Sequence, residues 1–507
     1  MIIYLDKNKS LLKRSDTLFY LQILLYVYII ILSKGVGKVR RAKIICTIGP
    51  ACDDVTILTK MAKAGMNVAR FNMSHGTHQS HKSQIDKVKD VRDKLNIALP
   101  IMIDTKGPEI RIRQFKNGSV ELKNRSTFTL TTEIVEGDET KVSVTFKDLP
   151  KIVSAGTKIL INDGLIELKV KSTTNNDIIC EVVFGGVLSN NKSINLPDIK
   201  LNMPYLSEQD KKDILFAVNN DVEYLALSFV RSRKDVIVIK DYLKRLNANN
   251  IKLISKIENQ QGIDNLEEII DESDGIMVAR GDLGVEVPFE RIPQIQKHII
   301  SRCLDKGKMV ITATQMLESM IEHSSPTRAE ISDVANAIID GSGSVMLSGE
   351  TSVGKFPILV VEVMDKIVRE CEQDLERNVN FNHFSNLEGN VTGSVAFGAC
   401  ALAQTSNAKA IIAVTKTGKT AIEISRFRPS VNILGCTFCD KVYQQLGAVW
   451  GVIPIKQPQL NSTEILLEHA REMAKNYKLV KKGDLVVQTA GKETGIEGSN
   501  MVALNYV

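Results

Sequence analysis

Between residues 42 and 350 the chain alternates short apolar runs with amphipathic stretches. This alternation is typical of repeated β-α units that build a parallel sheet. Most of the runs are continuously hydrophobic, as expected for strands that are covered on both faces, and eight strands are enough to close a (β/α)8 TIM barrel. The predicted strands are Ala42–Ile48, Asn67–Phe71, Pro100–Asp104, Tyr224–Phe229, Lys252–Ile257, Gly275–Ala279, Met309–Ala313 and Ser344–Leu347.

Two regions depart from this rhythm. Residues 108–204 hold short Thr/Val-rich alternating segments separated by turn pairs such as Asn117-Gly118, which predicts a β-rich domain inserted between the third and fourth strands. We expect this inserted domain to be a β-barrel. Beyond about residue 375, an Ala-rich helix and three further strands predict a smaller open α/β domain. Those elements are Ser394–Gln404, Ala410–Val414, Asn432–Thr437 and Asp484–Gln488. The expected division is an extension (1–38), a barrel (39–107 and 205–375), an inserted domain (108–204) and a C-terminal domain (376–507).

The extension contains an apolar run at residues 18–32 that is broken only by Gln22. The run is shorter than the roughly 20 residues that a spanning helix needs, and no small-residue cleavage site follows it. A signal-anchor is one interpretation. We favour a leader without a role in catalysis, so that membrane contact is not expected.

Composition and charge favour a globular protein and argue against a nucleic-acid-binding or disulfide-rich one. The chain has 507 residues, 43% of them hydrophobic and 24% charged, which is typical of globular proteins with several domains. The net charge of +6 resides in residues 1–41, so the rest of the chain is neutral and offers no electrostatic footprint for nucleic acid. The eight cysteines lack the spacing of a disulfide framework, which favours reduced thiols in a cytoplasmic protein. Cys436 and Cys439 form a CxxC, which we interpret as buried apolar cysteine ahead of a redox or zinc site.

Polar side chains follow most of the predicted barrel strands directly. The carboxyl ends of the strands form the active-site face of such barrels, so these side chains are expected to converge. A purely structural role for so many charged groups on one face is hard to sustain. The residues are Arg70, Asn72, Ser74, Asp104, Thr105, Lys106, Glu258, Asp282, Thr314, Gln315, Ser348 and Glu350.

Three of these positions predict phosphoryl transfer with a divalent metal. Glu258 and Asp282 are hard oxygen ligands that suit Mg²⁺. Lys256 precedes Glu258 by two residues, so both point to the same side of a strand, where an ammonium can neutralise charge on a moving phosphoryl group. An ordinary ion pair would explain Lys256 and Glu258 alone, but it does not explain Asp282 and the arginines.

A second oxygen-rich set comprises Asn72, Ser74, Asp104 and Thr105, and it suits a hard cation better than zinc or iron, although Asn72 and Ser74 could equally be capping residues. Gly281 permits close backbone approach, so that its N–H could hold a carboxylate or phosphate. His75, His78 and His81 recur every three residues. That spacing drifts around a helix, so we expect solvated helix-start histidines rather than a metal site.

Several long segments resemble the pyruvate kinase family, from about residue 39 to the C-terminus. The resemblance implies conversion of phosphoenolpyruvate and ADP to pyruvate and ATP by a phosphotransferase that needs Mg²⁺ (or Mn²⁺) and K⁺. The matching motifs are Cys46-Thr-Ile-Gly-Pro50, Ala69-Arg-Phe-Asn-Met-Ser-His-Gly76, Asp104-Thr-Lys-Gly-Pro-Glu-Ile-Arg111, Ile254-Ser-Lys-Ile-Glu-Asn259, Val278-Ala-Arg-Gly-Asp-Leu-Gly284, Ala313-Thr-Gln-Met-Leu-Glu-Ser319 and Met346-Leu-Ser-Gly-Glu-Thr351.

The resemblance also implies a role for each matching residue. Glu258 and Asp282 resemble the Mg²⁺ ligands, and Asn72, Ser74, Asp104 and Thr105 resemble the K⁺ site. Glu109 matches the form associated with K⁺ dependence, whereas relatives with lysine there tend not to need K⁺. The catalytic set is Arg70, Lys256, Thr314 and Ser348; substrate contacts come from Arg70, Lys256, Ala279, Gly281, Asp282 and Thr314, and nucleotide contacts from Asn72, His75, Arg111 and Lys192.

The sequence departs from the family pattern in the inserted domain, which is expected to close as a lid. Asp198 and Ser193 stand where glycine is common, and Asn162 stands where aspartate is common. These departures put nucleotide contacts and lid motion in doubt and leave the metal site intact.

A loop in the C-terminal domain resembles the one that binds a sugar-phosphate effector in regulated relatives. It comprises Thr415, Lys416, Thr417, Gly418, Lys419 and Thr420. The resemblance further implies a homotetramer in the cytoplasm. Two other hypotheses compete with this one: another phosphoenolpyruvate-using barrel enzyme, and a catalytically silent, membrane-tethered scaffold. The additional domains argue against the former, and the intact catalytic residues argue against the latter.

Overall fold

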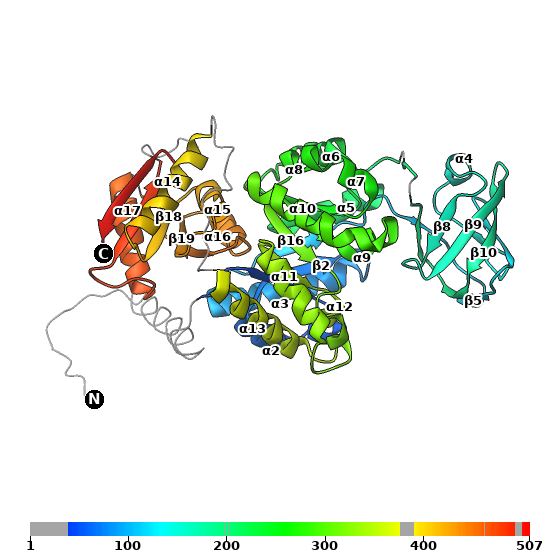
Figure 1. Cartoon of the computed structure of the whole chain (residues 1–507), viewed down its shortest axis with the longest axis horizontal. Coiled ribbons are helices and arrows are strands. Elements are labelled where there is room, and N and C mark those ends of the chain that lie inside the picture. Colours follow the sequence, from blue (N-terminus) through cyan, green and yellow to red (C-terminus); the bar gives the residue numbers. More distant parts are fainter. Residues whose placement is uncertain (1–38, 198, 202, 376–389, 461, 492–498) are drawn as a thin grey trace.

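The computed structural model describes residues 39–507 apart from 198, 202, 376–389, 461 and 492–498. The apolar run at residues 18–32 and Asp198 therefore lie outside the described residues. Within the described ranges, no helix combines the length and apolar character needed to cross a membrane. In Figure 1 the chain forms three bodies in a row, with the barrel in the middle, the inserted domain at one end and the C-terminal domain at the other.

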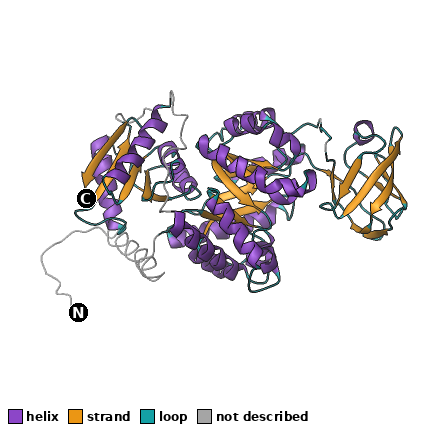
Figure 2. Ribbon diagram, viewed as in Figure 1, coloured by secondary structure: helices purple, strands orange, loops and turns teal. Residues whose placement is uncertain are grey.

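Eight parallel strands close the central barrel, in the order β1-β17-β16-β15-β14-β13-β3-β2 (Figures 1 and 2). Nearly all their residues are buried, because side chains fill the interior and helices cover the outside. The strands are β1 (Lys43–Thr47), β2 (Met66–Asn72), β3 (Ile101–Asp104), β13 (Tyr224–Leu227), β14 (Lys252–Ile257), β15 (Gly275–Ala279), β16 (Met309–Ala313) and β17 (Ser344–Leu347). This confirms the predicted barrel. The predicted fourth strand was two residues too long, because Phe229 has a φ of 54°, which extended backbone does not allow.

The longer barrel helices bury an apolar stripe. In α6, for example, Val236, Ile239 and Leu243 face the core at helical spacing. The helices around the barrel are α2 (Val55–Ala64), α3 (His78–Leu95), α5 (Glu208–Asn219), α6 (Arg233–Arg245), α7 (Gln260–Asp264), α8 (Leu266–Glu272), α9 (Arg280–Glu286), α10 (Ile292–Asp305), α11 (Arg328–Ile339), α12 (Gly349–Ser352) and α13 (Pro357–Leu375), with short 3₁₀ turns η1 (Pro50–Cys52), η2 (Phe289–Arg291) and η3 (Glu318–Ile321).

The inserted segment is a separate β-rich domain, as predicted, and it folds around its own apolar core. A seven-stranded sheet runs β4-β12-β8-β9-β10-β6-β7, and β11 pairs with β5. Its first and last strands, β4 and β12, pair with each other, with Ile110 opposite Ile194. The elements are β4 (Ile110–Arg111), β5 (Ser119–Leu122), β6 (Thr127–Thr131), β7 (Lys141–Ser143), α4 (Leu149–Ile152), β8 (Lys158–Ile161), β9 (Ile166–Thr173), β10 (Asp177–Phe184), β11 (Gly186–Ser189) and β12 (Ser193–Asn195).

The C-terminal domain is an open five-stranded sheet, β20-β19-β18-β21-β22, with only β22 antiparallel. The predicted α/β class is confirmed, and the sequence analysis missed β20 and β22. The elements are α14 (Val391–Thr405), β18 (Ala410–Val414), α15 (Lys419–Arg426), β19 (Asn432–Thr437), α16 (Asp440–Leu446), β20 (Val452–Lys456), α17 (Thr463–Asn476), β21 (Leu485–Ala490) and β22 (Met501–Tyr506).

Lys43 links the barrel to the C-terminal domain. Its side chain is buried at the start of β1, and Nζ donates a hydrogen bond to the carbonyl of Val452 at 2.8 Å. Burial, the largest cause, and nearby Arg40 together lower the pKa of Lys43 to about 7, although Glu372 offsets part of the shift. Between pH 7 and the ordinary lysine pKa of 10.5, the unfolded chain therefore binds more protons than the folded chain.

We expect this lysine to make stability rise with pH above 7, because the folded state no longer carries a buried charge there. Lys43→Met should remove that contribution, which amounts to about 1 kcal/mol per pH unit. Thermal midpoints from pH 6 to 9 test the expectation, with exposed Lys60→Met as the control. If the thermal midpoints of the parent protein and of Lys43→Met changed with pH in the same way, Lys43 would not be the group that causes the pH dependence of stability.

Candidate active site

The carboxyl ends of β2, β3 and β14 bring two cations and two carboxylates together inside the barrel mouth. Arg70 donates two hydrogen bonds to Asp104, from Nε to Oδ1 at 3.0 Å and from Nη2 to Oδ2 at 2.6 Å. Its Nη1 donates to Thr47 Oγ1. Lys256 Nζ lies 3.3 Å from Asp104 Oδ2 and 2.8 Å from Glu258 Oε1. All four side chains are buried, so the sequence prediction of a convergent charged cluster is correct for them.

Burial and charge pairing act in opposite directions on these groups. Burial by itself opposes ionisation of Asp104, but Arg70 and Lys256 outweigh it and lower the pKa of this carboxyl. Burial likewise disfavours the Lys256 ammonium, yet Glu258 and Asp104 more than offset it and raise the pKa of Lys256. The ammonium therefore stays charged at the mouth of the barrel.

Glu258 differs from Asp104 because burial raises its pKa, and the pairing with Lys256 offsets only part of that shift. Asp282 nearby raises the pKa of Glu258 further. One oxygen, Oε2, accepts the backbone N–H of Phe229 at 2.6 Å. The other, Oε1, contacts Lys256 without hydrogen-bond geometry and makes no hydrogen bond to any described residue. A carboxylate oxygen held in this way can still accept a cation.

Asp282 lies in the first turn of α9, directly after β15. The same turn places Gly281, whose N–H donates to Thr314 Oγ1 at 2.8 Å. Thr314 has a φ of 66°, a strained conformation for a β-branched residue. Arg280 holds it there: its Nη2 donates to the Thr314 carbonyl at 2.7 Å, while Nη1 binds Asp333 at 2.6 Å. The sequence analysis missed this positioning role of Arg280, although the residue stands inside the quoted motif.

Ser348 follows β17. Its N–H donates to Glu350 Oε2 at 2.6 Å, and its buried hydroxyl has no hydrogen-bond partner among the described residues. A buried hydroxyl without a partner is costly, and such a group in a cleft is often a functional one. Ser228, which directly follows β13, was also missed, and its Oγ accepts from Lys256 Nζ at 3.0 Å.

Three members of the second oxygen-rich set already make bonds within the protein. Asn72 Oδ1 accepts the Ser74 N–H at 3.0 Å, which is a turn bond and favours the structural alternative for Asn72. Thr105 is buried, and its N–H donates to the Ala226 carbonyl at 2.9 Å. Asp104 is the member already engaged by Arg70 and Lys256. Across the described ranges, no group of three or more His, Cys, Asp or Glu side chains is arranged to hold a metal ion.

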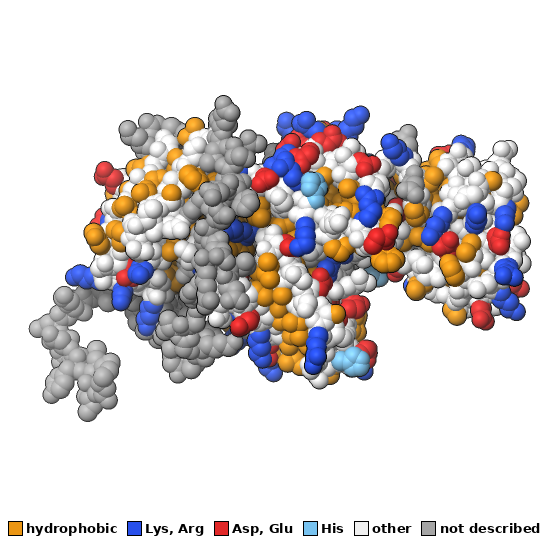
Figure 3. Space-filling model, in the orientation of Figure 1, with side chains coloured by type: hydrophobic (Ala, Val, Ile, Leu, Met, Phe, Trp, Pro, Cys, Tyr) orange, Lys and Arg blue, Asp and Glu red, His pale blue; other side chains and the backbone are white. Residues whose placement is uncertain are grey.

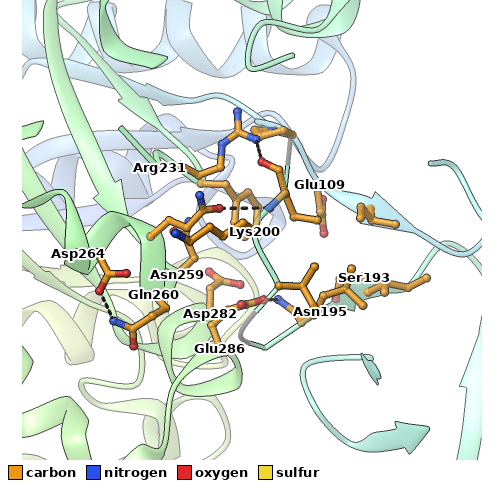
Figure 4. Close-up of a pocket in the computed structure, with 18 residues that line it drawn as sticks. Glu109, Ser193, Asn195, Lys200, Arg231, Asn259, Gln260, Asp264, Asp282 and Glu286 are labelled. Atoms are coloured by element: carbon orange, nitrogen blue, oxygen red, sulfur yellow. Dashed lines mark hydrogen bonds between the residues drawn. The ribbon is translucent and has the colours of Figure 1, made fainter. Parts of the chain in front are cut away.

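A cavity of about 170 Å³ lies between the barrel and the inserted domain, and Asp282 and Glu109 both line it (Figure 4). On one side Asp282 and Glu286 come from α9, and on the other Asn195 comes from β12. Asn195 Nδ2 donates to Glu286 Oε1 at 2.9 Å, a bond between the two domains that the sequence did not reveal. The inserted domain is thus in contact with the active-site face.

The predicted nucleotide residues are spread along the edge of the inserted domain and the start of α3. Arg111, in β4, pairs with Glu109 at 2.7 Å, and its Nη1 donates to the Asn191 carbonyl. Lys192, half-buried, precedes β12, the partner of β4. His75 lies on the surface between β2 and α3, and its pKa is lowered by partial desolvation of the ring and by nearby Arg111.

The other two histidines correct the sequence interpretation. His81 is buried, with one ring nitrogen 2.7 Å from the His75 carbonyl and its edge against Phe71. His78 stacks on Phe216 and pairs with Asp213 at 2.6 Å. Expecting solvated histidines was therefore correct for the exposed His75 and wrong for His81, which the packing of α3 against β2 buries. The cysteines of the described chain are free thiols, and Cys439 follows rather than continues the strand that holds Cys436.

The barrel, the inserted domain beside its mouth and the buried Arg70, Lys256, Asp104 and Glu258 define a (β/α)8-barrel transferase of anionic substrates. Two family models match the chain: pyruvate kinase, barrel domain, over residues 39–361, and pyruvate kinase, alpha/beta domain, over residues 393–504. The chain belongs to the pyruvate kinase family, whose members transfer the phosphoryl group of phosphoenolpyruvate to ADP in glycolysis.

Individual relatives agree over most of the length. A pyruvate kinase of Clostridium perfringens is 42% identical over 473 residues, covering 92% of this chain and all of that protein. One from Geobacillus stearothermophilus is 43% identical over 472 residues, covering 92% of this chain and 80% of the relative. The crystal structure of a pyruvate kinase from Cryptosporidium parvum superposes with a TM-score of 0.86 at 38% identity, covering 92% and 96% of the two chains. Members of this family need a divalent metal and usually potassium.

Proposed function

We propose that the chain carries out this reaction with Arg70, Lys256, Thr314 and Ser348 as its catalytic residues. The observation that carries the proposal is the position of Lys256 Nζ, a buried cation 2.8 Å from Glu258 and 3.3 Å from Asp104 at the barrel mouth. Arg70 and Lys256 bind the phosphate of phosphoenolpyruvate and stabilise the negative charge of the phosphoryl group as it moves to ADP. Thr314 and the Ser348 hydroxyl then supply, through water, the proton that converts the enolate to pyruvate.

Glu258 and Asp282 are the proposed ligands of Mg²⁺ (or Mn²⁺). The donor set fits this ion: both are hard oxygen ligands, and Glu258 Oε1 makes no hydrogen bond within the described structure. The bound ion would supply charge neutralisation and orientation of the phosphate oxygens. In the structure the Lys256 ammonium neutralises the charge of the Glu258 carboxylate. Metal binding therefore requires that the ammonium either moves away from this carboxylate or contacts it together with the metal.

The substrate carboxylate is proposed to bind the backbone at Ala279 and Gly281. The Gly281 N–H now donates to Thr314 Oγ1, so the substrate would replace that hydroxyl as acceptor. Asn72, His75, Arg111 and Lys192 are proposed to contact the nucleotide from the inserted domain and the start of α3. The bond between Asn195 and Glu286 supports lid closure by the inserted domain over this site.

The K⁺ site is proposed at Asn72, Ser74, Asp104 and Thr105. Asp104 would contribute a carboxylate that Arg70 already binds, and K⁺ tolerates such a shared ligand because its bonds are long and flexible. Glu109 lines the adjoining cavity and pairs with Arg111 at 2.7 Å.

We expect the parent enzyme to be at least severalfold faster in K⁺ than in Na⁺ at equal ionic strength. Glu109→Lys should reduce this difference, because a fixed ammonium would supply the missing positive charge. The control is Glu121→Lys, an exposed change in the same domain. Full activity of the parent in Na⁺ would contradict the K⁺ proposal.

The domain division (39–107 with 205–375, 108–204, 376–507) is proposed because each of the three regions has its own sheet structure and its own apolar core. The loop from Thr415 to Thr420, between β18 and α15, is proposed to bind a sugar-phosphate effector. A homotetramer in the cytoplasm is proposed from the family. Lys/Arg and Asp/Glu side chains are interspersed on the face drawn in Figure 3, which favours small-molecule substrates over nucleic acid as partners.

The decisive experiment is an assay of purified protein lacking residues 1–37 for pyruvate formed from phosphoenolpyruvate and ADP with Mg²⁺. Chromatography with light scattering gives the oligomeric state of the same sample, and fractionation of cells expressing the full chain gives its location. Absence of pyruvate both with and without K⁺ would refute the proposed active site.

A further inference from the structure

The residue that directly follows β13 contacts the lysine of the active site from the neighbouring strand. Strand β13 pairs in parallel with β14, and Ser228 comes immediately after its last residue. Ser228 is only 4% exposed, and its hydroxyl oxygen lies 3.0 Å from Lys256 Nζ. Within the described structure three groups contact this ammonium. Ser228 is the uncharged one, since the others are Asp104 at 3.3 Å and Glu258 at 2.8 Å.

The neighbours of the Ser228 hydroxyl determine the direction of each hydrogen bond that it makes. A lysine ammonium can only donate, and a backbone carbonyl can only accept. The hydroxyl therefore accepts from Lys256 Nζ and donates its single proton to the Thr105 carbonyl at 2.7 Å. The Ser228 N–H also donates to Thr105 Oγ1, at 3.3 Å. Thr105 thus holds the serine in the orientation that presents an oxygen lone pair to Lys256.

The backbone of Ser228 is held by both segments that connect the barrel to the inserted domain. Tyr205 lies where the chain returns to the barrel, and its hydroxyl donates to the Ser228 carbonyl at 2.8 Å. Gly107 lies where the chain leaves the barrel, and it packs against the same carbonyl with a φ of 69°. A Cβ at Gly107 would come 2.5 Å from that oxygen, so the close approach requires glycine. These contacts restrict the movement of Ser228 relative to β14.

The next residue along the chain holds the carboxylate that pairs with Lys256. The Phe229 N–H donates to Glu258 Oε2 at 2.6 Å, and Phe229 has a φ of 54°, which is rare for a bulky side chain. Strained backbone of this kind clusters at functional sites, where the surrounding structure enforces it. Ser228 and Phe229 together therefore contact both functional groups of β14.

We propose that Ser228 is a positioning residue for phosphoryl transfer, which holds the Lys256 ammonium where it meets the moving phosphoryl group. This inference rests on the proposed catalytic function of Lys256. Each carboxylate beside the ammonium has a second cation to bind, because Asp104 also pairs with Arg70 and Glu258 is a proposed metal ligand. The Ser228 oxygen has no such competing cation. It therefore fixes one N–H of the ammonium, and another N–H remains to stabilise the phosphoryl oxygens.

Ser228→Ala in the full chain is expected to lower kcat about 10- to 100-fold, because misplacement of a catalytic group by about 1 Å has an effect of this size. KM for ADP and the affinity for phosphoenolpyruvate, measured by calorimetry without turnover, should not change. Ser228→Cys keeps the size of the side chain but offers only a weak acceptor, so it should lose kcat as well, and it serves as the second variant if Ser228→Ala does not fold. The matched control is Ser255→Ala, which removes a buried β14 hydroxyl that bonds to Ser273 and should retain the parent kcat.

A double-mutant cycle shows whether the serine acts through the lysine. In a Lys256→Met background, Ser228→Ala should cause no further loss of kcat, because the ammonium that Ser228 positions is absent. An equal loss in both backgrounds would overturn the proposal, and so would a weaker affinity for phosphoenolpyruvate with an unchanged kcat.

The same variants distinguish this inference from the proposed function on which it rests. If Lys256→Met loses activity while Ser228→Ala and Ser228→Cys keep the parent kcat, the role of Ser228 is refuted and that of Lys256 stands. If Lys256→Met itself keeps the parent kcat, the proposed function of the lysine is refuted, and the positioning role of Ser228 with it.

Discussion

Lys256→Met is expected to lower kcat by about 10³- to 10⁵-fold, the range found when a single cation that stabilises a transferring phosphoryl group is removed. The chain should still fold, because Asp104 keeps both bonds from Arg70. Glu258 would lose its cation, and since burial already raises its pKa, it would take up a proton rather than remain a buried unpaired charge.

Initial rates at saturating phosphoenolpyruvate and ADP measure this effect. Lys240→Met, an exposed change on α6 whose ammonium pairs with Glu272 at 3.0 Å, is the matched control. A kcat for Lys256→Met within tenfold of the parent would mean that another group stabilises the moving phosphoryl.

Glu258→Gln is expected to weaken Mg²⁺ by on the order of 100-fold or more, since even residues behind a metal ligand commonly contribute 10- to 100-fold. The amide oxygen can still accept the Phe229 N–H, so the change is mainly one of charge. Activity at limiting Mg²⁺ should fall accordingly and should recover in part at high Mg²⁺.

The pH dependence gives this prediction a second readout. The raised pKa of Glu258 means that the metal-free site holds a proton above the ordinary carboxyl range, and Mg²⁺ must displace it. The apparent Mg²⁺ affinity of the parent should therefore increase as the pH rises above 4.5, and that of Glu258→Gln should vary less. Glu362→Gln, exposed on α13, is the control. The same pH profile in Glu258→Gln and the parent would exclude Glu258 as the group that titrates.

The barrel could be predicted from the sequence because its strands are short continuous apolar runs, and those at Lys252–Ile257 and Gly275–Ala279 have the bounds that the apolar pattern predicts. The convergence of Arg70, Asp104, Lys256 and Glu258 also followed, because topology alone places parallel strand ends on one face. Contacts that depend on backbone placement could not be predicted in this way. The pairing of Asn195 with Glu286 joins residues from different domains, and the burial of His81 depends on how α3 packs.

The sequence alone also did not reveal which charged side chains of the cluster pair with one another. Asp104 was expected as an oxygen ligand for K⁺, and the structure shows that Arg70 and Lys256 already pair with it. Residue spacing shows which acids and bases meet, but the actual pairs depend on distances of a few tenths of an ångström. The β20 and β22 strands were missed because β20 contains Pro454 and β22 lies at the sheet edge, where apolar alternation is weak.

The pairing of β4 with β12 has a consequence for how the chain reaches its native state. Barrel closure requires β3 to find β13, and the intervening segment runs from residue 105 to 223. Joining the ends of a flexible loop costs about 0.6 kcal/mol for each doubling of its length. If the inserted domain folds first, Ile110 and Ile194 already lie side by side. Only the connections from β3 to β4 and from β12 to β13 then remain to be ordered when the two barrel strands pair. Early folding of the insertion would therefore accelerate assembly of the catalytic barrel, and destabilising its core would slow barrel formation without altering any residue of the active site.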